Sequence, residues 1–303
     1  MAARSRSSGS DVEHESVLLD EAMELLAVRP GGLYVDGTLG PGGHAAEILR
    51  RSAPEGRVIG FDKDTEALGR AREVLAPFAP RIRFVHGDFR EAPKVLGEEK
   101  ADGILLDLGV SSLQLDRAER GFSFRTDGPL DMRMDRSAGP TAADLVNRLP
   151  EDELADLIYR LGEERASRRI ARAIVAARMR KHFETTGELA QVVRRSAGRA
   201  RRPGLDPATC TFQALRIAVN GELEGLERTL TDLAHCLAPE GRLAVIAFHS
   251  LEDRPVKHTF RGLAAQGGFT LLTRKPVRPG EAETRQNPRA RSARLRALLR
   301  EAA

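Results

Sequence analysis

The sequence contains little cysteine and no long apolar run. Only Cys210 and Cys236 occur in 303 residues, and their separation fits neither a disulfide framework nor the close pairs of a structural zinc site. No apolar stretch reaches the length that crosses a bilayer, and the first ten residues lack the hydrophobic segment of a signal peptide. We therefore expect a cytoplasmic protein that binds no metal and has a disordered N-terminus, residues 1–12.

A glycine-rich loop lacks the lysine that is typical of phosphate-binding loops. An apolar strand pattern, residues 33–36, leads into Asp36-Gly-Thr-Leu-Gly-Pro-Gly-Gly-His44 and then into a helix pattern. Glycine lets a ligand approach the backbone, and a helix N-terminus presents free N–H groups. The loop does not read G-x-G-x-x-G, and the acid that ends the strand would repel a phosphate. A tight turn without a ligand is the alternative.

A second acid supports a nucleoside ligand. The next strand pattern, residues 57–62, ends in Asp62 about twenty residues after the glycines, the position from which a carboxylate accepts hydrogen bonds from ribose hydroxyls. Together, Asp36 and Asp62 suit a ribose and a positively charged group. The pair favours S-adenosylmethionine over NAD or ATP.

Strand and helix patterns alternate in the first part of the chain. We expect strands at residues 33–36, 57–62, 82–86 and 103–107, with a helix after each of the first two strands. This alternation is typical of βαβ units, which form a parallel sheet with a ligand site at the carboxyl ends of its strands.

The pattern changes after residue 115. From residue 141 to about residue 198 the apolar spacing is helical. A predicted helix over residues 212–237 precedes further strand patterns at 242–248 and 269–273. We therefore expect an α/β, Rossmann-like domain formed by residues 13–115 and 210–303, with an inserted all-helical domain, residues 116–209.

Basic residues are unevenly distributed, although the net charge is only +4. Residues 165–202 hold twelve Lys or Arg against two acids, and residues 285–300 hold six arginines and no acid. Such blocks are typical of surfaces that bind a polyanion, and in a chain with a nucleoside site they favour a nucleic acid. A solvated helix face is the alternative.

Polar residues follow two predicted central strands. Asp107, Ser111 and Ser112 follow one strand, and His249 follows the other. The exocyclic amine of a base is a poor nucleophile, so an enzyme assists it by accepting its N–H bonds and aligning it with the methyl group. These four residues are our catalytic candidates. The serines are equally suited to cap the turn, and the histidine to a structural hydrogen bond.

Four further side chains bear on the ligand site or on the chemistry. Phe89 is suited to stack on an adenine or to pack in the core, and Asp88 is suited to bond the adenine amine. Methylation at carbon would require a nucleophilic cysteine. Cys210 and Cys236 do not follow strands at the ligand edge, so attack by a base nitrogen fits better.

Eight segments together resemble one family, the bacterial 16S rRNA cytosine-N4 methyltransferases, also called the MraW or RsmH family. They span nearly the whole chain: His14–Glu21, Asp36–His44, Gly103–Gln114, Arg120–Phe124, Gly128–Met134, Phe212–Ile217, Phe248–Arg254 and Asn287–Arg296. Two positions depart from the family pattern. Leu113 stands where proline is usual, and Cys210 where arginine is common.

The resemblance implies a class I, S-adenosylmethionine-dependent methyltransferase that modifies the N4 of a decoding-region cytidine, with 16S rRNA or the small ribosomal subunit as partner. Carried onto matching positions, the cofactor contacts would be Gly42, Gly43, His44, Asp62, Phe89, Asp107 and Gln114. A DNA methyltransferase, a ribosome-assembly factor that binds the adenosyl ligand only as a structural element, and an NAD-dependent oxidoreductase are the alternatives. The oligomeric state is open, with a homodimer as one possibility.

Overall fold

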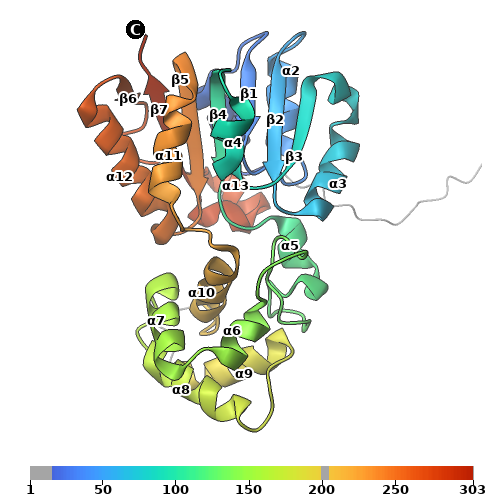
Figure 1. The fold of residues 1–303 in the computed structure, drawn as a ribbon, viewed down its shortest axis with the longest axis vertical. Helices are drawn as coiled ribbons and strands as arrows, with labels where there is room; N and C mark the ends of the chain where they lie inside the picture. Colours follow the sequence, from blue (N-terminus) through green and yellow to red (C-terminus); the bar gives the residue numbers. More distant parts are fainter. Residues whose placement is uncertain (1–15, 199–204, 303) are drawn as a thin grey trace, which may run out of the picture.

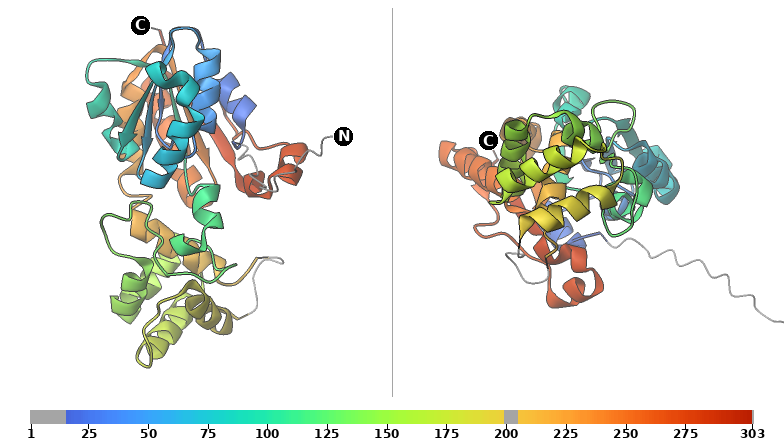
Figure 2. Two further views of the ribbon diagram at one scale, coloured as in Figure 1. Left: turned by 90° about the vertical axis from the view of Figure 1, so that its right-hand side faces the viewer. Right: turned by 90° about the horizontal axis from the view of Figure 1, so that it is seen from below.

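The computed structural model describes residues 16–198 and 205–302, so the predicted disordered N-terminus lies outside the described residues. The chain forms a sheet lobe and a smaller helical lobe (Figure 1). Seen from below, the helices of the second lobe lie across the end of the first (Figure 2). Within the described residues, no helix has the length and apolar character needed to cross a membrane.

The sheet lobe contains a seven-stranded sheet in the order β3-β2-β1-β4-β5-β7-β6. Its strands are β1 Leu33–Asp36, β2 Arg57–Asp62, β3 Ile82–His86, β4 Ala101–Asp107, β5 Leu237–Ala247, β6 Phe269–Leu271 and β7 Arg294–Arg300. The pairs among β1 to β5 are parallel, as predicted, whereas β7 runs antiparallel to both of its neighbours. This topology confirms the α/β, Rossmann-like fold.

Helices cover both faces of the sheet. Those on one face are α1 Leu19–Leu26, α2 Gly43–Arg51 and α3 Thr65–Val74, and those on the other are α4 Ala92–Leu96, α11 Leu226–His235 and α12 Ser250–Gln266. The strands are apolar on both sides, as expected for a sheet buried between two helical layers. The first face buries Leu105 and Ile246, and the second buries Ile104 and Val245. On the central strands β1, β2 and β4, the acids Asp36, Asp62 and Asp107 stand at the carboxyl ends.

The helical lobe has a core of its own. It contains α6 Ala142–Arg148, α7 Glu151–Gly162, α8 Ser167–Arg178, α9 Thr186–Ala197 and α10 Thr209–Asn220. Phe212 and Leu215 of α10 pack in this core, although the sequence-based boundary assigns α10 to the sheet domain. We therefore propose that the inserted domain extends to about residue 220.

Two sequence-based interpretations are corrected by the structure. The single helix predicted over residues 212–237 is wrong: Gly221 and Gly225 adopt φ of 58° and 61°, a left-handed conformation that ends α10 and precedes α11. The basic run of residues 285–300 contains strand β7, which we did not predict. Its Arg296 is buried and binds Asp253, so this arginine is part of the sheet.

Short helical elements follow β4 and precede β7. α5 Ser112–Asp116 and the 3-10 helix η3 Ala118–Arg120 follow β4 on the chain toward the helical lobe. α13 Glu281–Gln286 and the 3-10 helix η4 Pro288–Ser292 precede β7 and belong to the sheet lobe. Two further 3-10 helices, η1 Ala76–Arg81 and η2 Phe89–Glu91, flank β3. The carboxyl ends of the parallel strands consequently face the helical lobe.

Candidate active site between the two lobes

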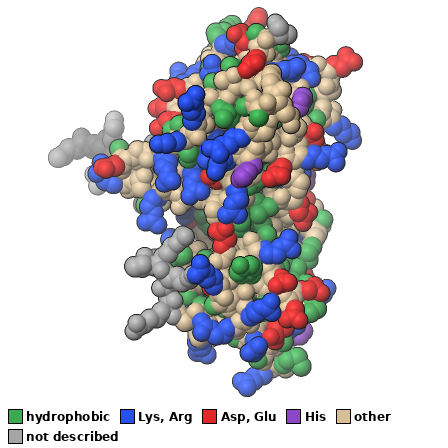
Figure 3. Space-filling model, turned by 90° about the vertical axis from the view of Figure 1, so that its left-hand side faces the viewer, with side chains coloured by type: hydrophobic (Ala, Val, Ile, Leu, Met, Phe, Trp, Pro, Cys, Tyr) green, Lys and Arg blue, Asp and Glu red, His purple; other side chains and the backbone are tan. Residues whose placement is uncertain are grey.

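A cavity of about 400 Å³ lies at the carboxyl ends of the central strands. From the side, the surface narrows at the junction of the two lobes, and hydrophobic side chains are visible there (Figure 3). All of the predicted site residues except Gly42 line the cavity: Gly43, His44, Asp62, Phe89, Asp107, Ser111, Ser112, Gln114 and His249. The fold therefore brings together residues that are far apart in the sequence.

The glycine-rich loop shapes one wall. Gly42 adopts a φ of 95°, and a Cβ there would lie 3.0 Å from Leu75, so this glycine serves the turn and its packing rather than the cavity. A Cβ on Gly43 would lie 2.1 Å from the Ser16 hydroxyl oxygen. A Cβ on Gly37 would lie 2.3 Å from the Leu106 side chain. The backbone is thus closely packed behind the loop.

Two carboxylates hold this loop. Asp62 accepts hydrogen bonds from the backbone N–H groups of Gly40, at 2.7 Å, and Asp64, at 2.8 Å. Asp36 accepts one from Thr38, at 3.2 Å, while its Oδ2 is buried without a hydrogen-bond partner in the described structure. Burial raises the pKa of Asp62 to about 6. Burial and the neighbouring Asp62 raise the pKa of Asp36 to about 7.

Asp107 ends β4 and faces the cavity. Its backbone N–H donates to the Thr38 hydroxyl at 2.6 Å, and its Oδ2 lies 3.9 Å from the Nδ1 of His44. The Oδ1 atom has no hydrogen-bond partner among the described residues. Burial, with the carboxylates of Asp36 and Glu252, raises the pKa of Asp107 well above its usual range. A cationic ligand or an N–H donor would stabilise this carboxylate.

Ser111 and Gln114 form a reciprocal helix cap. The Ser111 hydroxyl oxygen accepts from the Gln114 N–H, and the Gln114 side chain accepts from the Ser111 N–H. The Gln114 amide also donates to Asp64 at 2.9 Å. Ser111 therefore has the capping role that the sequence analysis gave as the alternative. It also lines the cavity, as Ser112 does.

Phe89 lines the cavity, whereas the Asp88 carboxylate is occupied by protein groups. Asp88 binds Lys63 at 2.6 Å and Arg90 at 2.5 Å. Although burial opposes it, these two cations lower the pKa of Asp88. The Arg90 guanidinium also lies over the Phe89 ring, 5.2 Å from its centroid. These contacts favour a structural role for Asp88 over a bond to adenine.

His249 belongs to a partly buried charge cluster that sequence reasoning missed. Its Nε2 lies 3.1 Å from Glu252 and 3.3 Å from Arg216, and Arg216 also binds Glu222 at 2.7 Å. Although burial opposes it, His249 and Arg216 lower the pKa of Glu252. The spacing of Glu252 three residues after His249 is the signal that sequence reasoning could have used.

This cluster has the residue types of a metal site but already contains a cation. Glu222, His249 and Glu252 offer ligand atoms within 4.8 Å of one another. The Arg216 guanidinium donates two hydrogen bonds to Glu222 and lies 3.8 Å from Glu252. A metal ion would have to displace this arginine, so we assign the cluster a positioning role.

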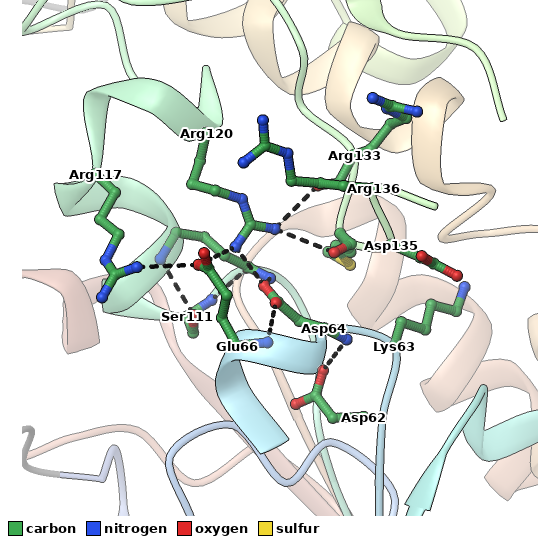
Figure 4. Close-up of polar contacts among 12 residues, drawn as sticks. Asp62, Lys63, Asp64, Glu66, Ser111, Arg117, Arg120, Arg133, Asp135 and Arg136 are labelled. Atoms are coloured by element: carbon green, nitrogen blue, oxygen red, sulfur yellow. Dashed lines mark hydrogen bonds and ion pairs between the residues drawn. The ribbon is translucent and has the colours of Figure 1, made fainter. Parts of the chain in front are cut away.

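A buried ion pair connects the cofactor side of the cavity to the helical lobe (Figure 4). Arg120, which is 1% exposed, donates to Asp64 at 2.7 Å and to Glu66 at 3.0 Å. Its other terminal nitrogen donates to the carbonyl oxygens of Arg133 and Met134. Met134 lines the cavity. Arg120 therefore fixes the chain that enters the helical lobe against the loop after β2.

The residues present fit S-adenosylmethionine better than a nucleotide phosphate. Asp107 lines the cavity with an oxygen that has no hydrogen-bond partner among the described residues, and a sulfonium or amino group beside it would favour the charged form of this carboxylate. Lys63 and Arg90 are paired with Asp88, and the glycine-rich loop contains no cation. A pyrophosphate would find little compensating charge on this loop.

The Arg120 pair predicts a large loss of stability on substitution. In Arg120→Met the Asp64 charge stays buried without its cation, and the unfolding free energy should fall by about 3–5 kcal/mol. Arg117 binds the same Glu66 but is largely exposed. Arg117→Met should therefore cost less than about 1 kcal/mol. Denaturant unfolding measures both, and equal losses would contradict the special role of Arg120.

The raised pKa of Asp36 predicts pH-dependent stability. An unfolded aspartate has a pKa of about 3.9, so up to about pH 7 the folded protein retains a proton that the unfolded chain has released. The unfolding free energy should therefore fall as pH rises through this window. Asp36→Asn should remove that contribution, on the order of 2–4 kcal/mol. Denaturant titrations at pH 5 and 8 measure this change in unfolding free energy. As a control, the exposed Asp152→Asn should show the same pH dependence as the wild type. If the unfolding free energy of Asp36→Asn depends on pH as that of the wild type does, the assignment is refuted.

Comparison with known proteins identifies the family. Residues 11–301 match the MraW methylase family. The chain is 53% identical to ribosomal RNA small subunit methyltransferase H of Citrifermentans bemidjiense, over 95% of this chain and 98% of that one. It is 56% identical to the protein of the same name from Gloeobacter violaceus, over 95% and 88%. A solved rRNA methylase from Streptococcus thermophilus is 13% identical with a TM-score of 0.41, over 93% of each chain, a likeness too weak to support an argument. The chain belongs to the MraW methylase family.

Proposed function

We propose that this protein transfers a methyl group to the exocyclic N4 of a cytidine in the decoding region of 16S rRNA, on naked rRNA or the small subunit. As a member of the MraW methylase family, it is a methyltransferase that uses S-adenosylmethionine. The observation that supports the N4 position is the unpartnered carboxylate of Asp107 at the cavity wall. Acceptors there suit an amine that carries two N–H bonds. We infer that it works in the cytoplasm.

The cofactor-binding residues would be those of the cavity's sheet side. Asp62 would accept hydrogen bonds from ribose hydroxyls, and Phe89 would contact the adenine. Gly43 and His44 would border the ligand at the start of α2, and Gln114 would close the opposite wall. Bound there, S-adenosylmethionine supplies an electrophilic methyl group. Asp36 and Asp107 would stabilise the positive charge next to it.

The target amine would be oriented by the ends of β4 and β5. Asp107 and the Ser112 hydroxyl would accept its N–H bonds, which aligns the nitrogen lone pair with the methyl group. The raised pKa of Asp107 makes its carboxylate a stronger base for the proton that the nitrogen releases. Ser111 would hold the turn, and His249 would position the wall through Glu252.

A covalent mechanism at carbon receives no support from the cysteines. Cys210 lies in α10 and Cys236 at the end of α11, and neither lines the described cavity. Burial raises the pKa of Cys236, which lowers its nucleophilicity. Direct attack by a base nitrogen needs no such group.

Asp62→Ala tests the cofactor assignment. The variant loses an acceptor for the ribose, so the dissociation constant for S-adenosylmethionine should rise on the order of 10- to 100-fold, as for a lost hydrogen bond to a charged group. Isothermal titration calorimetry measures this change, and thermal unfolding confirms that the variant folds. Cofactor binding as tight as that of the wild type would remove Asp62 from the site.

Nucleoside mass spectrometry tests the reaction. Unmodified small subunits, naked 16S rRNA and duplex DNA are each incubated with the enzyme and S-adenosylmethionine. We expect N4-methylcytidine in the rRNA and no product in DNA. The double variant Cys210→Ala, Cys236→Ala should give the same product at a similar rate. A 5-methylated product, or methylation of the DNA alone, would overturn the proposal.

A further inference from the structure

A third group of cations lies outside the two basic blocks of the sequence analysis. Between residues 254 and 278 the chain holds six Lys or Arg and no acid. On α12, Arg254, Lys257 and Arg261 recur at helical spacing, on a different side of the helix from the buried Val256. Arg274 joins Lys257 and Arg261 around one shallow depression of the surface. We call Lys257, Arg261, Arg274, Lys275 and Arg278 the α12 basic face.

The cations of this face are not neutralised within the protein. None of the five has a hydrogen bond or an ion pair with any residue that the structure describes. Four of them are exposed, and Lys257 is partly exposed. Uncompensated like charges repel one another. A polyanion that binds across them would relieve this repulsion.

The basic helices of the helical lobe differ in this respect. Five of the nine Lys or Arg described between residues 165 and 198 are bound to protein groups: Arg169 to the Ala197 carbonyl, Arg172 to Glu151, Arg178 to the Val146 carbonyl, Lys181 to Glu188 and Arg194 to Asp206. The predicted polyanion contacts on this lobe therefore compete with internal partners. The α12 basic face has no such competition.

The position of α12 links this face to the cavity. The helix begins at Ser250, directly after His249 in the cavity wall, and Arg254 in its first turns binds Glu163 of the helical lobe. Figure 3 shows Lys and Arg side chains gathered on the sheet lobe above the junction of the two lobes. A strand that leaves the cavity along α12 would meet Lys257 and then Arg261.

We propose that the α12 basic face binds the phosphate backbone of the RNA that flanks the target nucleotide. That the polyanion is RNA rests on the proposed function. The proposal adds a contact surface on the sheet lobe to the one expected on the helical lobe. Phosphate contacts position the strand without reading its sequence. The unpaired base can then enter the cavity while the backbone stays outside.

Neutralising the face tests this proposal. The triple variant Lys257→Gln, Arg261→Gln, Arg274→Gln is compared with the control Arg148→Gln, Arg172→Gln, Lys181→Gln, which removes equal charge from ion-paired positions of the helical lobe. The probe is a fluorescent single-stranded 16S rRNA fragment that spans the decoding region. Affinity is measured across a salt series, and S-adenosylmethionine binding reports that the site is intact.

The face variant should bind the RNA on the order of 100-fold more weakly at about 0.1 M salt, with a salt slope smaller by about 2, as three lost phosphate contacts predict. The control should stay close to the wild type. Wild-type affinity and slope in the face variant would overturn the proposal, as would an equal loss in the control. If the face variant binds the RNA as the wild type does but loses binding to phosphatidylserine vesicles, the face would be a membrane-binding surface instead. Absence of N4-methylcytidine from the wild-type reaction would contradict the proposed function but not this binding result.

Discussion

The buried contact between Arg120 and Asp64 is the interaction on which the site depends. Asp64 follows the ribose-binding candidate Asp62 by two residues, caps α3 and accepts from Gln114. Arg120 binds it from the chain that enters the helical lobe and also binds the Met134 carbonyl. This guanidinium therefore holds together the loop after β2, the turn after β4 and the chain that enters the helical lobe. A buried arginine loses its hydration, and at Arg120 both terminal nitrogens regain hydrogen bonds from the protein while the Nε has no partner among the described residues.

Charge is distributed differently inside and outside the site. Asp107 lines the cavity with an oxygen that has no partner among the described residues, and three cations that also line it are paired with carboxylates: Lys63 and Arg90 with Asp88, and Arg216 with Glu222. The interior thus favours a cationic ligand. The cations of the α12 basic face lie on the outer surface instead. This separation would let one molecule bind a sulfonium compound and a polyanion, as we propose, without the two competing for the same groups.

The sequence predicted the parallel part of the fold well because each strand there is a short apolar run that ends in a polar residue. The bounds of β1, β2 and β3 agree with the prediction. Strand β7 was missed because its arginines hide the pattern; Arg296 becomes buried only when Asp253 of α12 is brought beside it. The break between α10 and α11 was missed because the left-handed conformation of Gly221 is not required by its local sequence.

The same distinction applies to the site. Asp62, Asp107 and His249 could be selected from the sequence because they end strands that share one edge of a sheet. The partners of His249 could not be selected in this way, because the Arg216 cluster combines residues of α10, of the loop after it and of the start of α12. The sequence analysis left Ser111 open between a substrate contact and a turn cap, and it named Gln114 only through the family resemblance; in the structure the two residues cap α5. A turn held in this way keeps Asp107 and Ser112 in a fixed relation, which an in-line transfer requires. If Asp107 and Ser112 act as we propose, the cap is a structural contact that positions them.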